Sequence, residues 1–488
     1  MDLHVNLVDR KDLSGEIYRQ IRRAMADGLL RPGEALPPTR HLARRLLVSR
    51  TTVTIAYERL AAGGFVTSRV GAGTFVSDDA ARPSALNRFP AEGVLRARTV
   101  WASIRLPTTF DRPARYDFRT GLPSLELFPH RAWQRLVRHA LRPSLVAAGV
   151  YQEPAGHRGL REAIARHVGT SRGVSAVADD ITITNGAQQA LDILARTLLA
   201  PGDRIAVEDP GYQLPRRLFE SLGLETAGVR VDSDGLVVEA IPSGVRAVYV
   251  TPSHQYPLGV TMSLARRQSL LSWAERTNAA IIEDDYDGEF RFGDRPVDAL
   301  QTLDSSGRVV YVGSFSKVML PTLRLGFLIT PPSISRAAQA AKYVSDWNTS
   351  LLTQEALASF IEEGDFARHL RRVGAAYQER HDIIADTLRR DFADHLELLP
   401  SNAGLHLTAL AKCATPREII AITQSAAERG LAFHPLSMFT VENAPLAGVA
   451  LGYGAISTDN IEEGLRLLRA RFSESVGTAS DRFKENFD

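Results

Sequence analysis

The stretch GSFSKVMLPTLRLGF, from Gly313 to Phe327, places a single lysine among small hydroxylated residues, with an arginine seven positions later. Lysine is rare in this chain, because it supplies only 5 of the 58 basic residues and arginine supplies the other 53. A charge that only meets solvent is therefore almost always an arginine here. This makes Lys317 a candidate functional residue, and Arg324 lies close enough in sequence to belong to the same site.

Lys317 follows the last of five short apolar runs that each end in polar or glycine-rich residues. The runs alternate with helical patterns, which predicts a mostly parallel sheet with helices on both faces. Such sheets bind ligands at the carboxyl ends of their strands, so the five polar ends are expected to meet at one edge. The five segments are DITITNGAQQALDILARTLL, DRIAVEDPGY, VRAVYVTPSHQYPLG, AAIIEDDYDGEF and RVVYVGSFSK.

The residues at this edge suit a phosphate. After the run ITIT, Gly186, Ala187 and Gln188 open a helix whose first backbone N–H groups and dipole favour a bound anion. Hydroxyl and guanidinium groups can donate to the same anion. The candidate donors are Ser314, Ser316 and Arg324.

The same edge also suits a pyridine ring and an aldehyde. Asp284 follows the run AAII, and a buried carboxylate there can keep a heterocyclic nitrogen protonated, while Tyr286 can hydrogen-bond a phenolate oxygen. Lys317 can form a Schiff base with an aldehyde. Phosphate, pyridinium and aldehyde together describe pyridoxal 5′-phosphate (PLP), which is therefore the expected cofactor.

Each of these features also has an ordinary explanation. The residues after ITIT are compatible with any helix start, Lys317 with a surface lysine, and Asp284 with a solvated acidic cluster that includes Glu283, Asp285 and Asp287. What favours PLP is the combination, since each feature comes directly after a predicted strand.

A second function is indicated by the charge of the N-terminal segment. Residues 1–77 carry 12 basic and 7 acidic residues, a net charge of +5, whereas the remainder carries 46 and 49, a net charge of −3. A basic segment on a mildly acidic body is typical of a protein that contacts a polyanion at one end.

The pattern of this segment predicts a winged helix. LSGEIYRQIRRAMADGLL has apolar residues at helical spacing, Thr39 is placed to cap a second helix, and Ser49 is placed to cap a third, RTTVTIAYERLAAGG. FVTSRVGAGTFV then predicts a β-hairpin wing. Two short helices joined by a tight turn form a helix-turn-helix.

The third helix is the one expected to enter a major groove of double-stranded DNA. Arg50, Thr51 and Thr52 lie at its start, beside Ser49, and Arg69 lies on the wing. Arg40 and Arg44, on the second helix, are placed to neutralise phosphates. Protein binding or a purely structural role for the head remain alternatives to DNA binding.

The chain resembles one family over nearly its whole length. LRPGEALPPTRHLARRLLVSRTTVTIAYERLAAGGFVTSRVGAGTFV is similar to the winged-helix head of GntR-type bacterial regulators, and residues 117–468 resemble fold-type I aminotransferases. GSFSKVMLPTLRLGF, IEDDYDGEF, TPSHQYPLG and EDPGY are similar to the MocR family in particular. This resemblance implies a winged helix-turn-helix joined to an α/β aminotransferase-like domain, with a mostly parallel sheet and a smaller C-terminal α+β subdomain.

The expected organisation has four parts. Residues 1–77 form the DNA-binding domain, and residues 78–116, with scattered charge and no sustained period, form a linker that includes one helical turn at most. Residues 117–475 form the PLP-binding effector domain, whose small subdomain begins at about residue 370, and residues 476–488 form a tail.

The resemblance also implies roles for individual residues. Tyr212, in EDPGY, lies where the family has an aromatic residue near the cofactor, and Tyr151 matches a tyrosine that reaches the phosphate of a neighbouring subunit. A shared site implies a homodimer, which in this family is head-to-tail. For the cofactor itself, the implied ligands are Lys317 as the internal aldimine, Asp284 on the pyridine nitrogen, Tyr286 on O3′, and Arg324 with Ser314 on the phosphate.

Two positions depart from the family pattern. Family members read LRLGF near the C-terminus, where an arginine grips a substrate carboxylate, whereas GVALGYGAI puts Ala450 at that place. Losing such a charge-assisted contact weakens carboxylate binding by roughly 1.5–3 kcal/mol. The second departure is Thr322, where a glycine is common; its side chain is expected to narrow the phosphate loop.

These observations predict a cytoplasmic, PLP-dependent bacterial transcriptional regulator whose effector is PLP or an amino compound, with sensing expected rather than turnover. A working aminotransferase with an accessory DNA-binding head is the alternative, and residual half-transamination stays open, as does a cofactor-free body. No apolar run approaches the roughly 20 residues that a membrane span needs. The single Cys413 offers neither a disulfide nor a cysteine-based metal site, and no metal is expected.

Overall fold

The computed structural model describes residues 12–69, 71–77, 96–104, 106, 114–142, 151–292 and 298–476. The chain divides into two units, Met1–Arg98 and Thr99–Asp488, and each is described by itself. Most of the expected linker and nearly all of the expected tail lie outside the described residues. Within the linker, one short helix is present, α4 (Thr99–Ser103).

The first unit, called the head below, is a winged helix, as predicted. Ile17, Ile21, Val53 and Leu60 are completely buried and form the centre of its core, because each lies on the inward face of a helix. The two wing strands pair antiparallel, with Val66 opposite Val76. The elements are α1 (Leu13–Ala26), α2 (Thr39–Leu46), α3 (Arg50–Ala62), β1 (Val66–Arg69) and β2 (Gly73–Val76).

The two helix starts in the helix-turn-helix differ from each other. Ser49 caps α3, accepting a hydrogen bond from the backbone N–H of Thr52 at 3.0 Å, as predicted. The predicted cap at Thr39 is wrong: Thr39 is the first residue of α2, and Pro38 occupies the cap position without a side-chain hydrogen bond. Proline fixes its own backbone φ, so it sets the start of α2 without a capping oxygen.

The core of the second unit, called the body below, is an eight-stranded sheet in the order β4-β11-β10-β9-β8-β5-β6-β7. Strands β10, β9, β8, β5 and β6 run parallel to one another, and β4 shares their direction because β11 is antiparallel to both β10 and β4. The mostly parallel sheet and the shared edge of the five polar ends are thus confirmed. The bounds are β4 (Ile181–Thr184), β5 (Arg204–Asp209), β6 (Glu225–Asp232), β7 (Gly235–Leu236), β8 (Val245–Val250), β9 (Ala280–Asp285), β10 (Val309–Ser314) and β11 (Gly326–Ile329).

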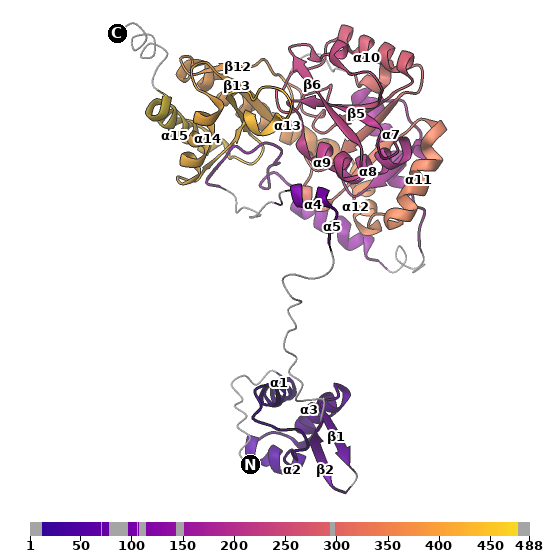
Figure 1. The fold of residues 1–488 in the computed structure, drawn as a ribbon, viewed down its shortest axis with the longest axis vertical. Helices are drawn as coiled ribbons and strands as arrows, with labels where there is room; N and C mark the ends of the chain where they lie inside the picture. The colour runs from indigo at the N-terminus through magenta and orange to yellow at the C-terminus, as the bar shows by residue number, and fades with distance from the viewer. Residues whose placement is uncertain are drawn as a thin grey trace. The chain divides into compact units, whose positions relative to one another are not determined.

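Helices cover both faces of this sheet, as shown in Figure 1. Buried residues of α8 (Ala187–Leu198), α9 (Gln213–Ser221) and α11 (Pro332–Asp346) pack on one face. Buried residues of α7 (Arg158–Arg172) and α10 (Leu264–Thr277) pack in two other clusters that include the remaining inward side chains of the strands. Further helices of the body are α5 (His130–Ala140) and α12 (Leu351–Glu362), which pack against each other.

The C-terminal part forms the smaller α+β subdomain that was predicted. Its four-stranded antiparallel sheet has the order β12-β13-β16-β15, and Figure 1 draws it beside the large sheet in orange and yellow. Its elements are α13 (Asp365–Asp391), β12 (Leu396–Leu398), β13 (His406–Ala411), α14 (Pro416–Ala427), β14 (Leu431–Ala432), β15 (His434–Pro435), β16 (Gly448–Gly452) and α15 (Thr458–Val476), and β14 pairs with β3 (Tyr116–Asp117). Across the part of the chain that the structure describes, no helix is both long and apolar enough to cross a bilayer.

Candidate cofactor site

A cavity of about 260 Å³ opens where the parallel strands of the large sheet end. Strands β8, β9 and β10 and helix α8 each bring residues to its wall, which confirms that the polar ends meet. The lining residues are Thr120, Gly121, Ala187, Gln188, Tyr212, Tyr249, Thr251, Tyr256, Asp284, Tyr286, Ser314, Ser316, Lys317, Pro321 and Arg324.

One end of the cavity is formed by the start of α8. Gly186 is the cap residue of this helix, with φ +76°, and no described side chain caps the helix. The Arg324 guanidinium lies against this backbone: it donates to the Asn185 carbonyl at 2.9 Å, and a Cβ on Gly186 would be only 3.0 Å from its Nη2 atom. Ser314 and Ser316 are adjacent in the wall, with the Ser316 N–H donating to Ser314 Oγ at 3.1 Å. A helix N-terminus, a guanidinium and hydroxyl groups make this end suitable for a phosphate.

Thr322 does not narrow this end of the cavity, so that expectation is wrong. It lies in a short 3-10 turn, Pro321–Leu323, and its side chain is exposed to solvent. Arg324, the residue after this turn, adopts a left-handed backbone with φ 52°, and its guanidinium donates to the Asn185 carbonyl beside the start of α8.

Asp284 forms the floor of the cavity, in β9. Its Oδ2 atom accepts a hydrogen bond from the Tyr249 hydroxyl at 2.7 Å. Its Oδ1 atom is buried and has no hydrogen-bond partner among the described residues. Burial raises the pKa of Asp284 to about 6, although the bond from Tyr249 opposes this shift. An unpartnered buried carboxylate oxygen is costly unless it meets a donor, and a protonated pyridine nitrogen is such a donor.

Lys317 lies opposite, with its Nζ atom donating to the Gly121 carbonyl at 2.7 Å. Gly121 has φ +79°, and a Cβ there would be 3.0 Å from Nζ, so glycine permits this close approach. Burial lowers the pKa of Lys317, against the opposing effects of Asp287 and Asp284. A lysine with a lowered pKa is more often neutral and hence nucleophilic at neutral pH. The residues around the cavity therefore fit PLP at three separate points.

The lowered pKa of Lys317 predicts how PLP attachment depends on pH. Because only the neutral amine attacks an aldehyde, the attachment rate rises with pH and levels off once Lys317 is deprotonated. We expect that plateau at a lower pH than for an exposed lysine, whose ordinary value is about 10.4. Stopped-flow experiments can follow the visible absorption of lysine-bound PLP from neutral pH to above about pH 10.4, with N-acetyl-lysine methylamide as the reference amine. They test whether the pKa of Lys317 is lower than that of an exposed lysine. A plateau at or above that of the reference amine would contradict the expectation.

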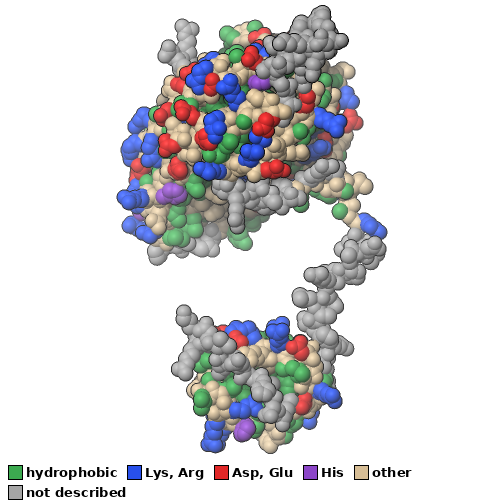
Figure 2. Space-filling view, turned by 90° about the vertical axis from the view of Figure 1, so that its left-hand side faces the viewer, with side chains coloured by type: hydrophobic (Ala, Val, Ile, Leu, Met, Phe, Trp, Pro, Cys, Tyr) green, Lys and Arg blue, Asp and Glu red, His purple; other side chains and the backbone are tan. Residues whose placement is uncertain are grey.

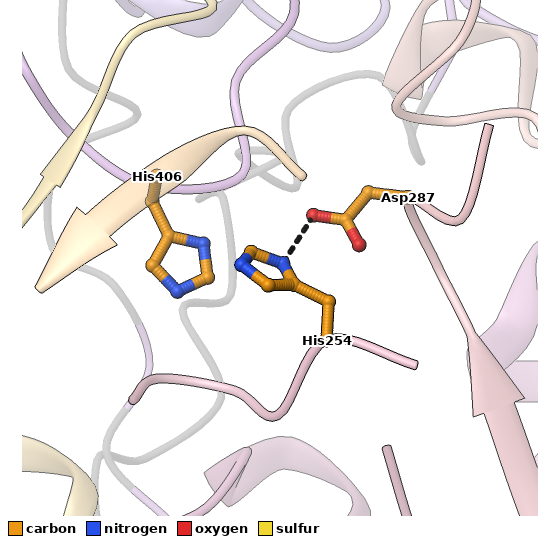
Figure 3. Close-up of side chains that lie close together, drawn as sticks. All are labelled: His254, Asp287 and His406. Atoms are coloured by element: carbon orange, nitrogen blue, oxygen red, sulfur yellow. Dashed lines mark hydrogen bonds and ion pairs between the residues drawn. The ribbon is translucent and has the colours of Figure 1, made fainter. Parts of the chain in front are cut away.

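Tyr286 is supported by a buried histidine. Its hydroxyl donates to the His254 carbonyl at 2.9 Å and lies 3.1 Å from His254 Nδ1. His254 Nδ1 is also 3.0 Å from Asp287 Oδ2, and Figure 3 shows the His254 ring between Asp287 and His406. His254 Nε2 contacts Ser401 Oγ at 3.2 Å, and His406 Nε2 contacts the Pro257 carbonyl at 2.9 Å. Since these nitrogens already have protein partners, we interpret the cluster as a support for Tyr286 rather than a metal site.

The acidic residues near Asp284 are not a solvated cluster, which removes that alternative. Glu283, Asp284, Asp285 and Asp287 are all buried. Asp285 is paired with Arg172, whose Nε atom lies 2.7 Å from Asp285 Oδ2, and it also accepts from the Tyr311 hydroxyl at 2.8 Å. Glu283 accepts from two backbone N–H groups, and burial raises its pKa to about 7. Buried carboxylates next to a cavity are typical of a functional site.

The two tyrosines that were assigned by resemblance lie in different places. Tyr212 lines the cavity, with its ring 5.8 Å from that of Tyr256 in an edge-on arrangement. Tyr151 does not line it: its ring stacks on Trp347 at 4.2 Å, and 77% of its surface is exposed. Its expected role at the phosphate of a second subunit stays a prediction.

Several lining residues were missed from the sequence. Tyr249 and Thr251 lie on either side of Val250, the last residue of β8, and an almost continuously buried strand gives no sign that one tyrosine reaches a carboxylate on the next strand. Thr120 and Gly121 come from a loop after β3 without a motif of its own. Tyr256 lies in TPSHQYPLG, the loop that follows the end of β8 at Val250, and its place in this loop is a signal that could have identified it.

In the head, most of the expected DNA contacts are accessible. Arg40, Arg44, Arg50, Thr51 and Arg69 are exposed, and Thr52 is half-buried. Ser49 is also exposed, although its hydroxyl already serves as the cap of α3. Figure 2 shows several basic side chains on the drawn face of the head, together with fewer acidic ones, and both kinds interspersed on the body. A basic surface around the start of α3 is compatible with contact to DNA phosphates.

Comparison with known families gives two matches along the chain. Residues 13–76 match the bacterial regulatory proteins of the gntR family, and residues 129–466 match the aminotransferases of class I and II. The probable rhizopine catabolism regulatory protein MocR of Rhizobium meliloti is 38% identical, over 94% of this chain and 93% of its own length. The pyridoxine biosynthesis transcriptional regulator PdxR of Corynebacterium glutamicum is 34% identical, over 94% and 95%.

Solved aminotransferase structures resemble a large part of the chain. An archaeal alanine:glyoxylate aminotransferase has a TM-score of 0.69 at 26% identity, covering 73% of this chain and 90% of its own. The Pyrococcus horikoshii kynurenine aminotransferase has a TM-score of 0.68 at 27% identity, covering 78% and 95%. The expected fold is thereby confirmed for the head and for the body. With relatives that match from end to end, the chain belongs to the MocR family, in which a gntR-type winged helix precedes an aminotransferase class I and II domain.

Proposed function

We propose that this protein is a cytoplasmic, PLP-dependent transcriptional regulator, which binds promoter DNA through its head and senses an amino compound or PLP itself in the body. The observation that carries the proposal is that a single chain contains both a gntR-type winged helix and a cavity where Lys317, Asp284 and Arg324 stand together. Two similar proteins are named as regulators, one of rhizopine catabolism and one of pyridoxine biosynthesis, which supports regulation over turnover.

The cavity residues have distinct roles in this proposal. Bound PLP would supply an electrophilic aldehyde that reacts reversibly with amines. Arg324, Ser314, Ser316 and the start of α8 would hold the phosphate, and Asp284 would keep the ring nitrogen protonated. Lys317 would provide the amine that anchors PLP. The Tyr249 hydroxyl occupies one oxygen of Asp284, and the other, which is buried without a partner among the described residues, would be available to the ring nitrogen.

Regulation requires that the ligand favour one arrangement of the protein over another. A ligand that binds two arrangements equally well shifts neither, however tightly it binds. We therefore expect PLP, or an amine added to the PLP-loaded protein, to change DNA affinity by a factor of about 5–150, the range of typical allosteric coupling. Fluorescence anisotropy with a genomic fragment selected by the protein itself measures this change. An unchanged affinity, together with ordinary steady-state turnover of about 1–1,000 per second on a common amino acid pair, would favour the aminotransferase alternative.

The head offers a prediction that separates DNA binding from cofactor binding. Arg50→Ala removes an exposed guanidinium at the start of α3, so we expect DNA binding to weaken by about 1–3 kcal/mol, or roughly 5- to 150-fold. Uptake of PLP, followed by visible absorption, should not change. Arg19→Ala is the matched control, because Arg19 is in the same unit but is engaged by Glu16 on α1 and by Asp12, the cap residue of that helix. Equal losses in both variants, or a loss of PLP uptake, would contradict the assignment of Arg50.

We also propose that the protein is a homodimer with a head-to-tail arrangement. Tyr151, Tyr343 and Val344 leave 77%, 46% and 77% of their surface exposed, and the rings of Tyr151 and Tyr343 both pack on Trp347. This exposed apolar group lies next to Asp346, which contacts Asn185 at the phosphate end of the cavity. Exposed apolar groups of this kind are typical of interaction surfaces. Sedimentation equilibrium of the parent and of Val344→Glu tests the proposal, and a monomeric parent would refute it.

A further inference from the structure

The charges that line the cavity restrict what it can accept besides PLP. Among the described lining residues, Lys317 and Arg324 are the only cations, and the proposed function uses both for PLP. The other polar groups are hydroxyls, one amide and the Asp284 carboxyl. A second anionic ligand would therefore find no positive partner in the described wall of one chain.

The wall beside Lys317 is instead a chain of hydroxyl groups. Thr120 Oγ1 lies 2.6 Å from the Tyr256 hydroxyl and 2.9 Å from His434 Nδ1. Burial lowers the pKa of His434 to about 4, so this imidazole is neutral near pH 7 and offers no charge to an anion. The neighbouring Arg119 is near enough to help lower the His434 pKa, but its charge is paired with Asp117, to which it makes two hydrogen bonds at 2.8 and 2.6 Å.

Behind this hydroxyl chain the structure is apolar. Ala450, in β16, is completely buried with Leu436 and Phe439, and the ring of Tyr256 packs against them. Ala450 pairs with Thr408 on β13 and with His434 on β15. Neither of these two side chains is charged near neutral pH. A carboxylate placed here would be desolvated without a counter-charge, which costs several kcal/mol.

We infer that the effector is an amine that carries neutral hydroxyl groups and has no carboxylate or sulfonate group. Its hydroxyl groups exchange hydrogen bonds with Tyr256, Thr120 and Tyr212, while its amine lies toward Lys317. The inference rests on the proposed function, because it takes PLP to occupy Arg324 and Lys317. It adds the chemical class of the ligand that the same cavity recognises.

Matched pairs of compounds test this class directly on the PLP-loaded full-length protein. Each pair exchanges a CH₂OH group for a carboxylate: 3-aminopropan-1-ol with β-alanine, 4-aminobutan-1-ol with γ-aminobutyrate, and 2-amino-2-deoxyglucitol with 2-amino-2-deoxygluconate. We expect at least one alcohol to bind ten or more times more tightly than its acid, by calorimetry and by the change in visible absorption. Tighter binding of the acids would mean that a cation from outside the described wall reaches the cavity, and it would overturn the inference.

The experiments distinguish a wrong ligand class from a wrong proposed function. A protein that takes up PLP and binds DNA, yet responds to neither member of any pair, refutes the amine class and remains compatible with sensing of PLP itself. A protein without any visible absorption from PLP refutes the proposed function as well.

One substitution tests the hydroxyl chain itself. Tyr256→Phe keeps the ring that packs on Ala450 and removes the hydroxyl group, so we expect the alcohols to lose about tenfold in affinity while the acids change less than twofold. Tyr18→Phe, on α1 of the head and absent from the cavity lining, is the control and should leave both unchanged. An equal loss for alcohols and acids in Tyr256→Phe would show that the hydroxyl group only shapes the cavity, which would overturn its assigned contact.

Discussion

Lys317→Ala is expected to abolish the visible absorption of lysine-bound PLP and to weaken PLP binding by roughly two orders of magnitude, or about 3 kcal/mol. The expectation follows from geometry, because Lys317 is the only lysine among the described lining residues and its Nζ atom is held at 2.7 Å from the Gly121 carbonyl, inside the cavity. Arg324 and Ser314, the proposed phosphate donors, remain in the variant, so weak, non-covalent binding should persist. Absorption spectroscopy and equilibrium dialysis separate the two effects.

Two further variants test whether the loss of the absorption band is specific to the amine of Lys317. Lys317→Arg preserves the positive charge but cannot attach to an aldehyde at neutral pH, so it should also lack the absorption band. Lys412→Ala removes an exposed lysine of the small subdomain and should retain the full band. If the band survived in Lys317→Ala, another amine would be the anchor and the cavity would have been assigned wrongly. DNA binding by Lys317→Ala without PLP should match that of the PLP-free parent.

The cofactor site could be anticipated from the sequence because its residues follow strands. Asp284, Ser314 and Lys317 each come at or just after the end of a parallel strand, and the direction of such strands brings their ends to one edge. The apolar runs ending at these residues are local signals that one sequence is enough to detect. The same holds for the head, where the cap at Ser49 and the wing hairpin depend on neighbouring residues.

The residues that were missed depend on contacts between distant segments. Gly121 meets Lys317 across 196 positions, and Thr120 meets His434 across 314, so no local pattern carries either pair. Thr322 is exposed, and the turn that contains it ends at Arg324, whose left-handed backbone is unusual for a residue other than glycine and is not marked by a local pattern. The burial of the acidic residues next to Asp284 likewise depends on Arg172, which lies over 100 positions earlier in the chain.

That buried pair leads to the largest expected change in stability. Arg172→Ala is expected to lower the free energy of unfolding of the body by about 3–5 kcal/mol, because it leaves Asp285 buried without its counter-charge. Arg172 and Asp285 each expose only 2% of their side chains, and the Arg172 Nη2 atom also donates to Ser253 Oγ at 2.6 Å. Urea unfolding of the PLP-free protein can be followed by tryptophan fluorescence, since all four tryptophans, at positions 101, 133, 273 and 347, lie in the second unit.

A matched control lies on the same helix. Arg158 pairs with Glu162 on α7, but both side chains are largely exposed, at 67% and 44%, so Arg158→Ala should cost less than about 1 kcal/mol. The substitution of Arg172 should also affect the candidate cofactor site. Without Arg172, the negative charge of Asp285 is uncompensated and disfavours ionisation of the neighbouring Asp284, which is the expected partner of the PLP ring nitrogen. Arg172→Ala should therefore bind PLP more weakly even under conditions where it is folded, whereas Arg158→Ala should bind it like the parent. If the two variants unfolded at the same urea concentration, the buried pair would have no special role in holding β9, and with it Asp284, in place.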